Sequence, residues 1–141
     1  RVLPRHRQDR RPATREEDSV RLIHRNGTIM IRVREAREED VGQIREIFLA
    51  VYGTDYPHRE LYDELWLKRS VFTDDALILV AEDTEAGRVV GTASVLFDFG
   101  AHSDLVGEFG RLAVHPEYRR MQVGKLLMDK RLEAIKNRWH V

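Results

Sequence analysis

The residues best suited to bind a ligand lie in one stretch, residues 108–127, which reads EFGRLAVHPEYRRMQVGKLL. The pattern predicts a strand that stops at His115 and Pro116, followed by a helix rich in Leu and Met. Between the two lies a short basic loop, Tyr118 to Gln122. A loop that leads into a helix presents free backbone N–H groups and the positive end of the helix dipole. The stretch therefore predicts an anion site at the start of the helix.

Three cationic side chains belong to this helix start: Arg119, Arg120 and Lys125. One interpretation is a solvated basic cluster without a ligand. Positive charge at a helix N-terminus opposes the dipole, however, and is unfavourable unless an anion binds there. The charges therefore favour an anion site, where an arginine adds charge-assisted hydrogen bonds.

Two side chains near this site can exchange protons at moderate pH. Strand alternation predicts that Glu108 lies on the same face as Leu112 and Val114, together with Gly110. A carboxylate beside apolar neighbours is partly desolvated and suits a general base. The alternative is a solvent-exposed strand carboxylate. His115 is a second candidate base, although its place at the end of the strand also suits a structural role.

The composition of the chain is typical of a globular protein. It has 141 residues, of which 42% are hydrophobic and 34% charged, and this predicts a single domain with its own core. The net charge of zero makes nucleic acid an unlikely partner, and no apolar run is long enough to span a membrane. The absence of cysteine excludes thiolate chemistry and agrees with a cytoplasmic location. The histidines show no metal-site spacing, so no metal is expected.

Residues 1–28 differ from the rest. Residues 1–15 hold six arginines and two prolines with little to bury, which predicts an Arg-rich leader or linker. A short extra strand is compatible with residues 19–24. The alternative is a basic arm for nucleic acid, but the segment has no interleaved aromatic residues for stacking on bases. The domain is expected to comprise residues 29–141.

Periodicity along residues 29–141 predicts strands and helices in an order typical of an α+β fold. The expected strands are residues 28–34, 76–81, 88–97 and 105–114, and the expected helices are residues 41–53, 59–71 and 121–138. The last helix is expected to bury Val123, Leu127, Leu132 and Ile135. Helices on either side of a strand meander predict a mostly antiparallel, twisted sheet with helices on both faces.

This order, together with three segments, resembles the GNAT superfamily of acyl-CoA-dependent N-acetyltransferases. Residues 119–124, RRMQVG, occupy the place of the family's Arg/Gln-x-x-Gly-x-Gly/Ala motif, with Gln122 where the first glycine is usual. Residues 30–40 resemble the first strand and helix entry of the family, and the strand containing Gly91 resembles its Val-Val-Gly-x-Ala strand. Glycine lets a backbone approach a pyrophosphate closely, so Gln122 implies weaker coenzyme binding.

The resemblance implies acetyl-CoA as co-substrate and assigns roles to particular residues. The backbone of Leu112, Ala113 and Val114 would pair with the pantetheine arm. Glu108 would be the catalytic base, and Tyr52, Tyr56 and Glu60 would line the pocket for the amine. The residues implied to hold the pyrophosphate are Arg119, Arg120, Met121, Gln122, Val123, Gly124 and Lys125.

The function expected from the resemblance is direct transfer of an acetyl group from acetyl-CoA to a primary amine. The alternative is a non-catalytic acyl-CoA-binding or regulatory domain of a larger protein. The family's fold continues beyond a helix such as residues 121–138. We therefore expect either a fragment, or a homodimer or larger polypeptide that supplies the C-terminal part.

Overall fold

The computed structural model describes residues 19–53, 65, 76–98 and 106–139, and every structural statement below concerns these residues. The Arg-rich residues 1–18 lie outside the described part, as does the helix expected at residues 59–71 apart from residue 65. The described elements are β1 (Val20–His24), β2 (Gly27–Glu35), the 3-10 turn η2 (Glu38–Asp40), α2 (Val41–Tyr52), β3 (Ala76–Asp83), β4 (Arg88–Asp98), β5 (Val106–Val114), the 3-10 turn η4 (Pro116–Tyr118) and α4 (Val123–Trp139).

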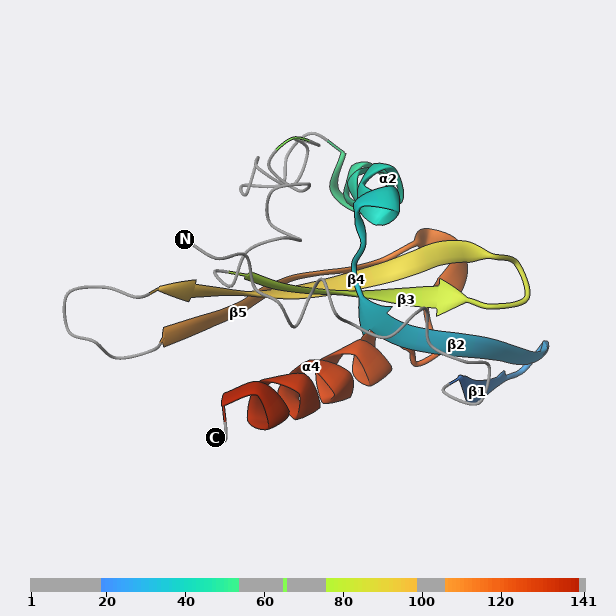
Figure 1. Ribbon diagram of the computed structural model, residues 1–141. Coiled ribbons are helices and arrows are strands. Elements are labelled where there is room, and N and C mark those ends of the chain that lie inside the picture. Colours follow the sequence, from blue (N-terminus) through green and yellow to red (C-terminus); the bar gives the residue numbers. More distant parts are fainter. Residues whose placement is uncertain (1–18, 54–64, 66–75, 99–105, 140–141) are drawn as a thin grey trace.

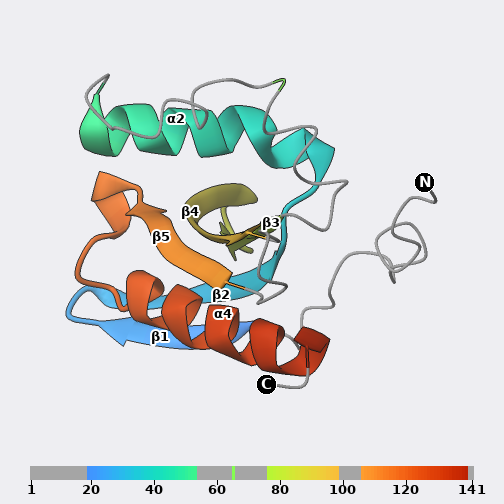
Figure 2. The same cartoon turned by 90° about the vertical axis from the view of Figure 1, so that its left-hand side faces the viewer.

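The described strands form one antiparallel sheet in the order β1-β2-β3-β4-β5. Helix α2 covers one face of this sheet and α4 covers the other (Figures 1 and 2). The predicted α+β class, with an antiparallel sheet between helices, is confirmed. Residues 20–24 form β1, which pairs with β2 and so lies within the same sheet.

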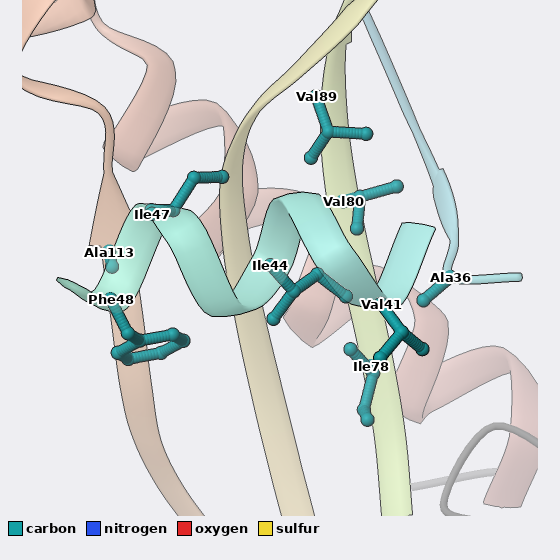
Figure 3. Packing of buried hydrophobic residues seen from close by; sticks show 9 residues of the cluster. All are labelled: Ala36, Val41, Ile44, Ile47, Phe48, Ile78, Val80, Val89 and Ala113. Atoms are coloured by element: carbon teal, nitrogen blue, oxygen red, sulfur yellow. The ribbon is translucent and has the colours of Figure 1, made fainter. Parts of the chain in front are cut away.

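Helix α2 packs through one apolar stripe. Its buried residues recur at helical spacing and pack against β3, β4 and β5 (Figure 3). The helix ends at Gly53, whose φ of 61° lies in the left-handed region that glycine adopts without strain. This ending places Tyr52, the last helical residue, near β5. The members of this core are Ala36, Val41, Ile44, Ile47, Phe48, Ile78, Val80, Val89 and Ala113.

The opposite face packs against α4 through Val123 and Leu127, which are 1% and 0% exposed. The helix lies very close to β4 because residue 91 has no side chain. A Cβ on Gly91 would lie 3.0 Å from Leu127 Cδ1 and 3.3 Å from Val123 Cγ1. Gly91 thus sets the spacing between α4 and the sheet, and with it the position of the helix start.

One expectation for α4 is wrong. Leu132 is 48% exposed, whereas Arg131 is 8% exposed and donates from Nη1 to the Ser94 carbonyl at 3.1 Å. Residue 131 follows Leu127 by four positions and so continues the buried face, while residue 132 has rotated past it. The long arginine side chain covers the sheet there in place of a leucine.

Buried ion pairs fasten the start of α2 to the sheet. Arg34 donates to both carboxylate oxygens of Asp40 at 2.7 and 3.0 Å, and its Nε donates to Glu82 at 3.1 Å. The side chains of Arg34 and Asp40 are 9% and 6% exposed. Arg32 adds a second contact to Glu82 at 3.0 Å. Burial alone would raise the pKa of Glu82, but hydrogen bonds and charges from Arg32 and Arg34 outweigh it and lower that pKa.

Candidate functional site

The edge strand β5 carries a bulge in its second half. Ala113 pairs with Thr92 and Gly110 pairs with Ser94, so both Arg111 and Leu112 lie opposite Ala93 alone. A bulge leaves one residue without ladder partners and bends the strand. The bulge therefore lies at the start of the segment Leu112–Val114 that was expected to meet the pantetheine arm, whereas Ala113 and Val114 remain paired with β4.

The bulge also corrects the predicted alternation of β5. Gly110 pairs with Ser94 and Ala113 pairs with Thr92, two residues apart on β4, so Gly110 shares a face with Ala113. Ala113 belongs to the core under α2, whereas Leu112 and Val114 pack on the α4 side. The expectation that Gly110 lies on the face of Leu112 and Val114 is wrong, because the extra residue shifts the alternation by one.

The same register applies to residue 108. Glu108 pairs with Leu96, two residues beyond Ser94, so it belongs by register to the face that α2 covers. Desolvation by Leu112 and Val114 is therefore not a reason to regard Glu108 as a base. Its side chain lies outside the described part of the structure.

Tyr52 joins α2 to the bulge. Its hydroxyl donates to the Leu112 carbonyl at 3.1 Å, and its ring stacks on Phe48 with 5.9 Å between ring centroids. The structure thus brings together a residue expected to bind the acceptor and a residue expected to bind the coenzyme. Tyr56 and Glu60, the other two expected acceptor residues, lie outside the described residues.

The loop between η4 and α4 has an unusual backbone. Arg120 and Gln122 have φ of 64° and 69°, in the left-handed region that favours glycine. Residue 122 therefore adopts the backbone that a glycine would adopt, although it carries a side chain. Arg119, Arg120 and Gln122 are exposed.

Helix α4 begins directly after this loop. The amide of Leu126 donates to the Gln122 carbonyl at 3.0 Å, so the amides of residues 123–125 precede the first such intrahelical bond. Lys125 is exposed and Val123 is in the core, so Val123 offers only its backbone here. Gly124 lies beside β5, since a Cβ there would be 3.7 Å from Val114 Cγ2. The loop and the first turn thus form a basic, amide-rich surface beside the end of β5.

Two neighbouring residues complete this region. The imidazole Nδ1 of His115 accepts a hydrogen bond from the Glu117 amide at 3.2 Å and so caps η4, which gives His115 a structural role. The hydroxyl of Tyr118 donates to the Asp83 carboxylate at 2.5 Å. Sequence reasoning gave Tyr118 no role of its own, and its only signal was its position immediately before the basic residues.

Within the described residues, no group of three or more His, Cys, Asp or Glu side chains is arranged to hold a metal ion. Neither does any helix of that part combine the length and the apolar character needed to cross a membrane.

Comparison with known proteins places this geometry among acetyltransferases. The model of the Acetyltransferase (GNAT) family matches residues 41–141. No curated protein matched the sequence.

Several solved structures are similar. A glucosamine N-acetyltransferase region of a fungal multi-domain beta-N-acetylglucosaminidase is 25% identical with a TM-score of 0.60, covering 75% of this chain and 12% of that one. An acetyltransferase from Trypanosoma brucei is 24% identical with a TM-score of 0.56, covering 76% of this chain and 75% of that one. Glucosamine-6-phosphate N-acetyltransferase from Arabidopsis thaliana is 21% identical with a TM-score of 0.58, with coverage of 76% and 75%.

Proposed function

The chain belongs to the acetyltransferase (GNAT) family, and from that premise we propose that it transfers an acetyl group from acetyl-CoA to a primary amine. The observation that carries the proposal is the continuous path from the β5 bulge to the amide-rich start of α4, with Tyr52 at the bulge. The bulge, the end of β5 and the start of α4 would receive the acyl carbonyl, the pantetheine arm and the pyrophosphate, which is the order of these groups along acyl-CoA.

The coenzyme would be held mainly by backbone. The pantetheine amides can pair with Leu112, Ala113 and Val114 at the sheet edge as an added strand does. The pyrophosphate would accept from the amides of residues 120–125 and from the guanidinium of Arg119 or Arg120. Met121 and Val123 support this loop from the core side.

The reaction requires a neutral amine. Alkylamines have a pKa of about 10, so at neutral pH the amine must lose a proton before it attacks the thioester carbonyl. We assign that proton to Glu108, directly or through water. The pairing of residue 108 with Leu96, on the face of the sheet that α2 covers, supports this assignment. A backbone N–H at the bulge would stabilise the oxyanion of the tetrahedral intermediate. When the intermediate collapses, the C–S bond breaks and the thiolate takes up the second proton that the amine nitrogen loses, so coenzyme A leaves as a thiol.

The acceptor class can be narrowed for testing. Two of the similar structures are acetyltransferases for glucosamine and glucosamine-6-phosphate, whose amino groups lie on sugar rings. A panel should therefore begin with amino sugars and continue to amino acids, peptide N-termini and lysine side chains. Tyr52, Tyr56 and Glu60 are the proposed acceptor residues.

Calorimetric titration with acetyl-CoA, followed by thiol release with the amine panel, tests the proposal. Binding together with amine-dependent thiol release supports an acetyltransferase. Binding without turnover on any amine would instead support the non-catalytic acyl-CoA-binding function, which the glutamine at residue 122 favours. Absence of binding at millimolar coenzyme would contradict both.

The base is tested by Glu108→Gln, with Glu85→Gln in the exposed β3–β4 turn as the matched control. Loss of a general base lowers kcat by about 10²–10⁴-fold. We expect such a fall for Glu108→Gln with little change in KM for acetyl-CoA, and wild-type kinetics for Glu85→Gln. Full turnover by Glu108→Gln would show that another group takes the proton.

A further inference from the structure

A buried carboxylate at the β3–β4 turn reaches the loop that precedes α4. Asp83, at the end of β3, is 6% exposed and divides its carboxylate between two tasks. Its Oδ1 accepts from the amides of Glu85 and Ala86, both at 3.1 Å, which shapes the turn. Its Oδ2 accepts from the Tyr118 hydroxyl at 2.5 Å. One aspartate therefore ties the turn to a residue 35 positions later in the chain.

Tyr118 is the last residue of η4 and precedes Arg119 directly. Its amide donates to the His115 carbonyl at 2.8 Å, and its ring lies 5.7 Å from the guanidinium carbon of Arg88. Burial and the neighbouring Asp83 raise the pKa of Tyr118 to about 12, so its hydroxyl remains a donor throughout the neutral range.

The loop that follows is held at both ends. At one end Tyr118 is bound to Asp83, and at the other Val123 is 1% exposed in the core under α4. Between them, Arg120 and Gln122 keep positive φ angles. Non-glycine residues hold such angles only where the surrounding structure fixes them. Releasing either end would let residues 119–122 relax to other conformations.

We propose that Asp83 is a positioning residue for the coenzyme site: through Tyr118 it holds residues 119–122 in the conformation that receives the pyrophosphate. The inference rests on the proposed function, since it requires coenzyme to bind at this loop. It adds a residue on a different hairpin that acts on affinity without touching the ligand. The loop would lose affinity in proportion to the fraction of molecules in which its binding conformation is no longer populated.

The test compares Tyr118→Phe with the wild-type chain. The substitution removes the hydroxyl and keeps the ring over Arg88. We expect the Kd for coenzyme A, measured by calorimetry, to rise roughly tenfold, because hydrogen bonds to charged groups contribute about that factor or more. Pantetheine, which lacks the pyrophosphate, serves as the second probe in an NMR titration, and its Kd should stay within twofold of the wild-type value.

Two further variants separate positioning from general stability. Thr84→Val is the control, since it removes a hydroxyl that donates to the Met30 carbonyl at 3.3 Å from the same turn. It should lower the Tm without changing the Kd for coenzyme A. Asp83→Asn retains an oxygen for the turn amides and supplies an amide donor to the Tyr118 oxygen. The Kd of the Asp83→Asn variant for coenzyme A should therefore stay within about threefold of the wild-type value.

The outcomes are distinguishable. If wild type does not bind coenzyme A, the proposed function fails. If wild type binds and Tyr118→Phe binds equally well at a lower Tm, the Asp83–Tyr118 pair is purely structural and the inference is overturned. Equal losses for coenzyme A and pantetheine, or a loss in Asp83→Asn as large as in Tyr118→Phe, would overturn it as well.

Discussion

Gln122 is the residue at which local backbone and sequence conflict most clearly, and replacing it with glycine is the sharpest test of the loop. Its φ of 69° lies in the left-handed region, where an L-residue is disfavoured by roughly 1–2 kcal/mol. Glycine removes that strain but loses more conformational freedom on folding, which costs about 0.5–1 kcal/mol. The difference predicts that Gln122→Gly raises the free energy of unfolding by about 0–1.5 kcal/mol.

The same substitution should strengthen coenzyme binding. Without a Cβ, the backbone of residue 122 can approach the pyrophosphate more closely. We expect a lower Kd for coenzyme A in calorimetry and an unchanged Kd for pantetheine. Gln122→Ala is the matched control, because it keeps the Cβ and the backbone strain but removes the side-chain amide. Its unfolding free energy should equal that of wild type within about 0.5 kcal/mol.

Wild type, Gln122→Gly and Gln122→Ala are compared by urea denaturation, which gives the free energy of unfolding, and by calorimetry, which gives the Kd for coenzyme A. A Gln122→Gly chain clearly less stable than wild type would refute the assignment of strain to residue 122. A Gln122→Ala chain that loses affinity while Gln122→Gly gains none would show that the glutamine amide contacts the phosphates. In that case the side chain would be a ligand-binding group and not an obstacle.

Three further predictions concern packing and charge. Gly91→Ala should lower the free energy of unfolding by about 1 kcal/mol, because its Cβ would lie 3.0 Å from Leu127 Cδ1. In the same urea titration Gly42→Ala should raise that free energy, because a Cβ on Gly42 would meet nothing within 4 Å and alanine favours the helix. Arg34→Met should destabilise the fold by about 3–5 kcal/mol, because it leaves the carboxylate of Asp40 buried without its arginine; a loss below about 1 kcal/mol would contradict this. Glu82 has a lowered pKa in the folded state. Its contribution to stability is therefore fully present above the unfolded-state pKa of about 4.3 and is lost as the pH falls through the lower folded-state pKa. Glu82→Gln should make the free energy of unfolding less dependent on pH in this acid range, and an unchanged dependence would argue against the ion pairs.

The order of strands and helices could be predicted from the sequence because the apolar periodicity of each element agrees with the way it packs. The apolar residues of α2 recur every three or four positions. Val41, Ile44, Ile47 and Phe48 are buried, and Val51 is half-buried against the same core. The register of β5 was not predictable, since a bulge inserts one residue without any change in the apolar pattern of Leu112, Ala113 and Val114. The face of Glu108 was therefore misjudged, although its strand was correctly expected.

The exposure of Leu132 and the contact made by Tyr118 were not predicted, for related reasons. An exposed leucine and a buried arginine one residue before it reverse the ordinary preferences, and only the geometry of α4 against β4 decides between them. Tyr118 depends on Asp83, 35 residues away in sequence, and a single chain gives no sign that the two meet. Pairings between distant segments are the information that periodicity does not contain.

The start of α4 is positioned by two features: Gly91 on β4 and the positive φ angles of the loop before the helix. Gly91 lets α4 approach β4, which fixes where Val123 and the first amides of the helix lie. Gln122 and Arg120 then turn the chain into that fixed start with positive φ angles, while Tyr118 holds the other end of the loop to Asp83. Moving the helix by Gly91→Ala should therefore weaken coenzyme A binding through the same loop as Tyr118→Phe. If the two changes act on one loop conformation, their combined effect on Kd should be less than the product of the separate effects, whereas independent effects would multiply.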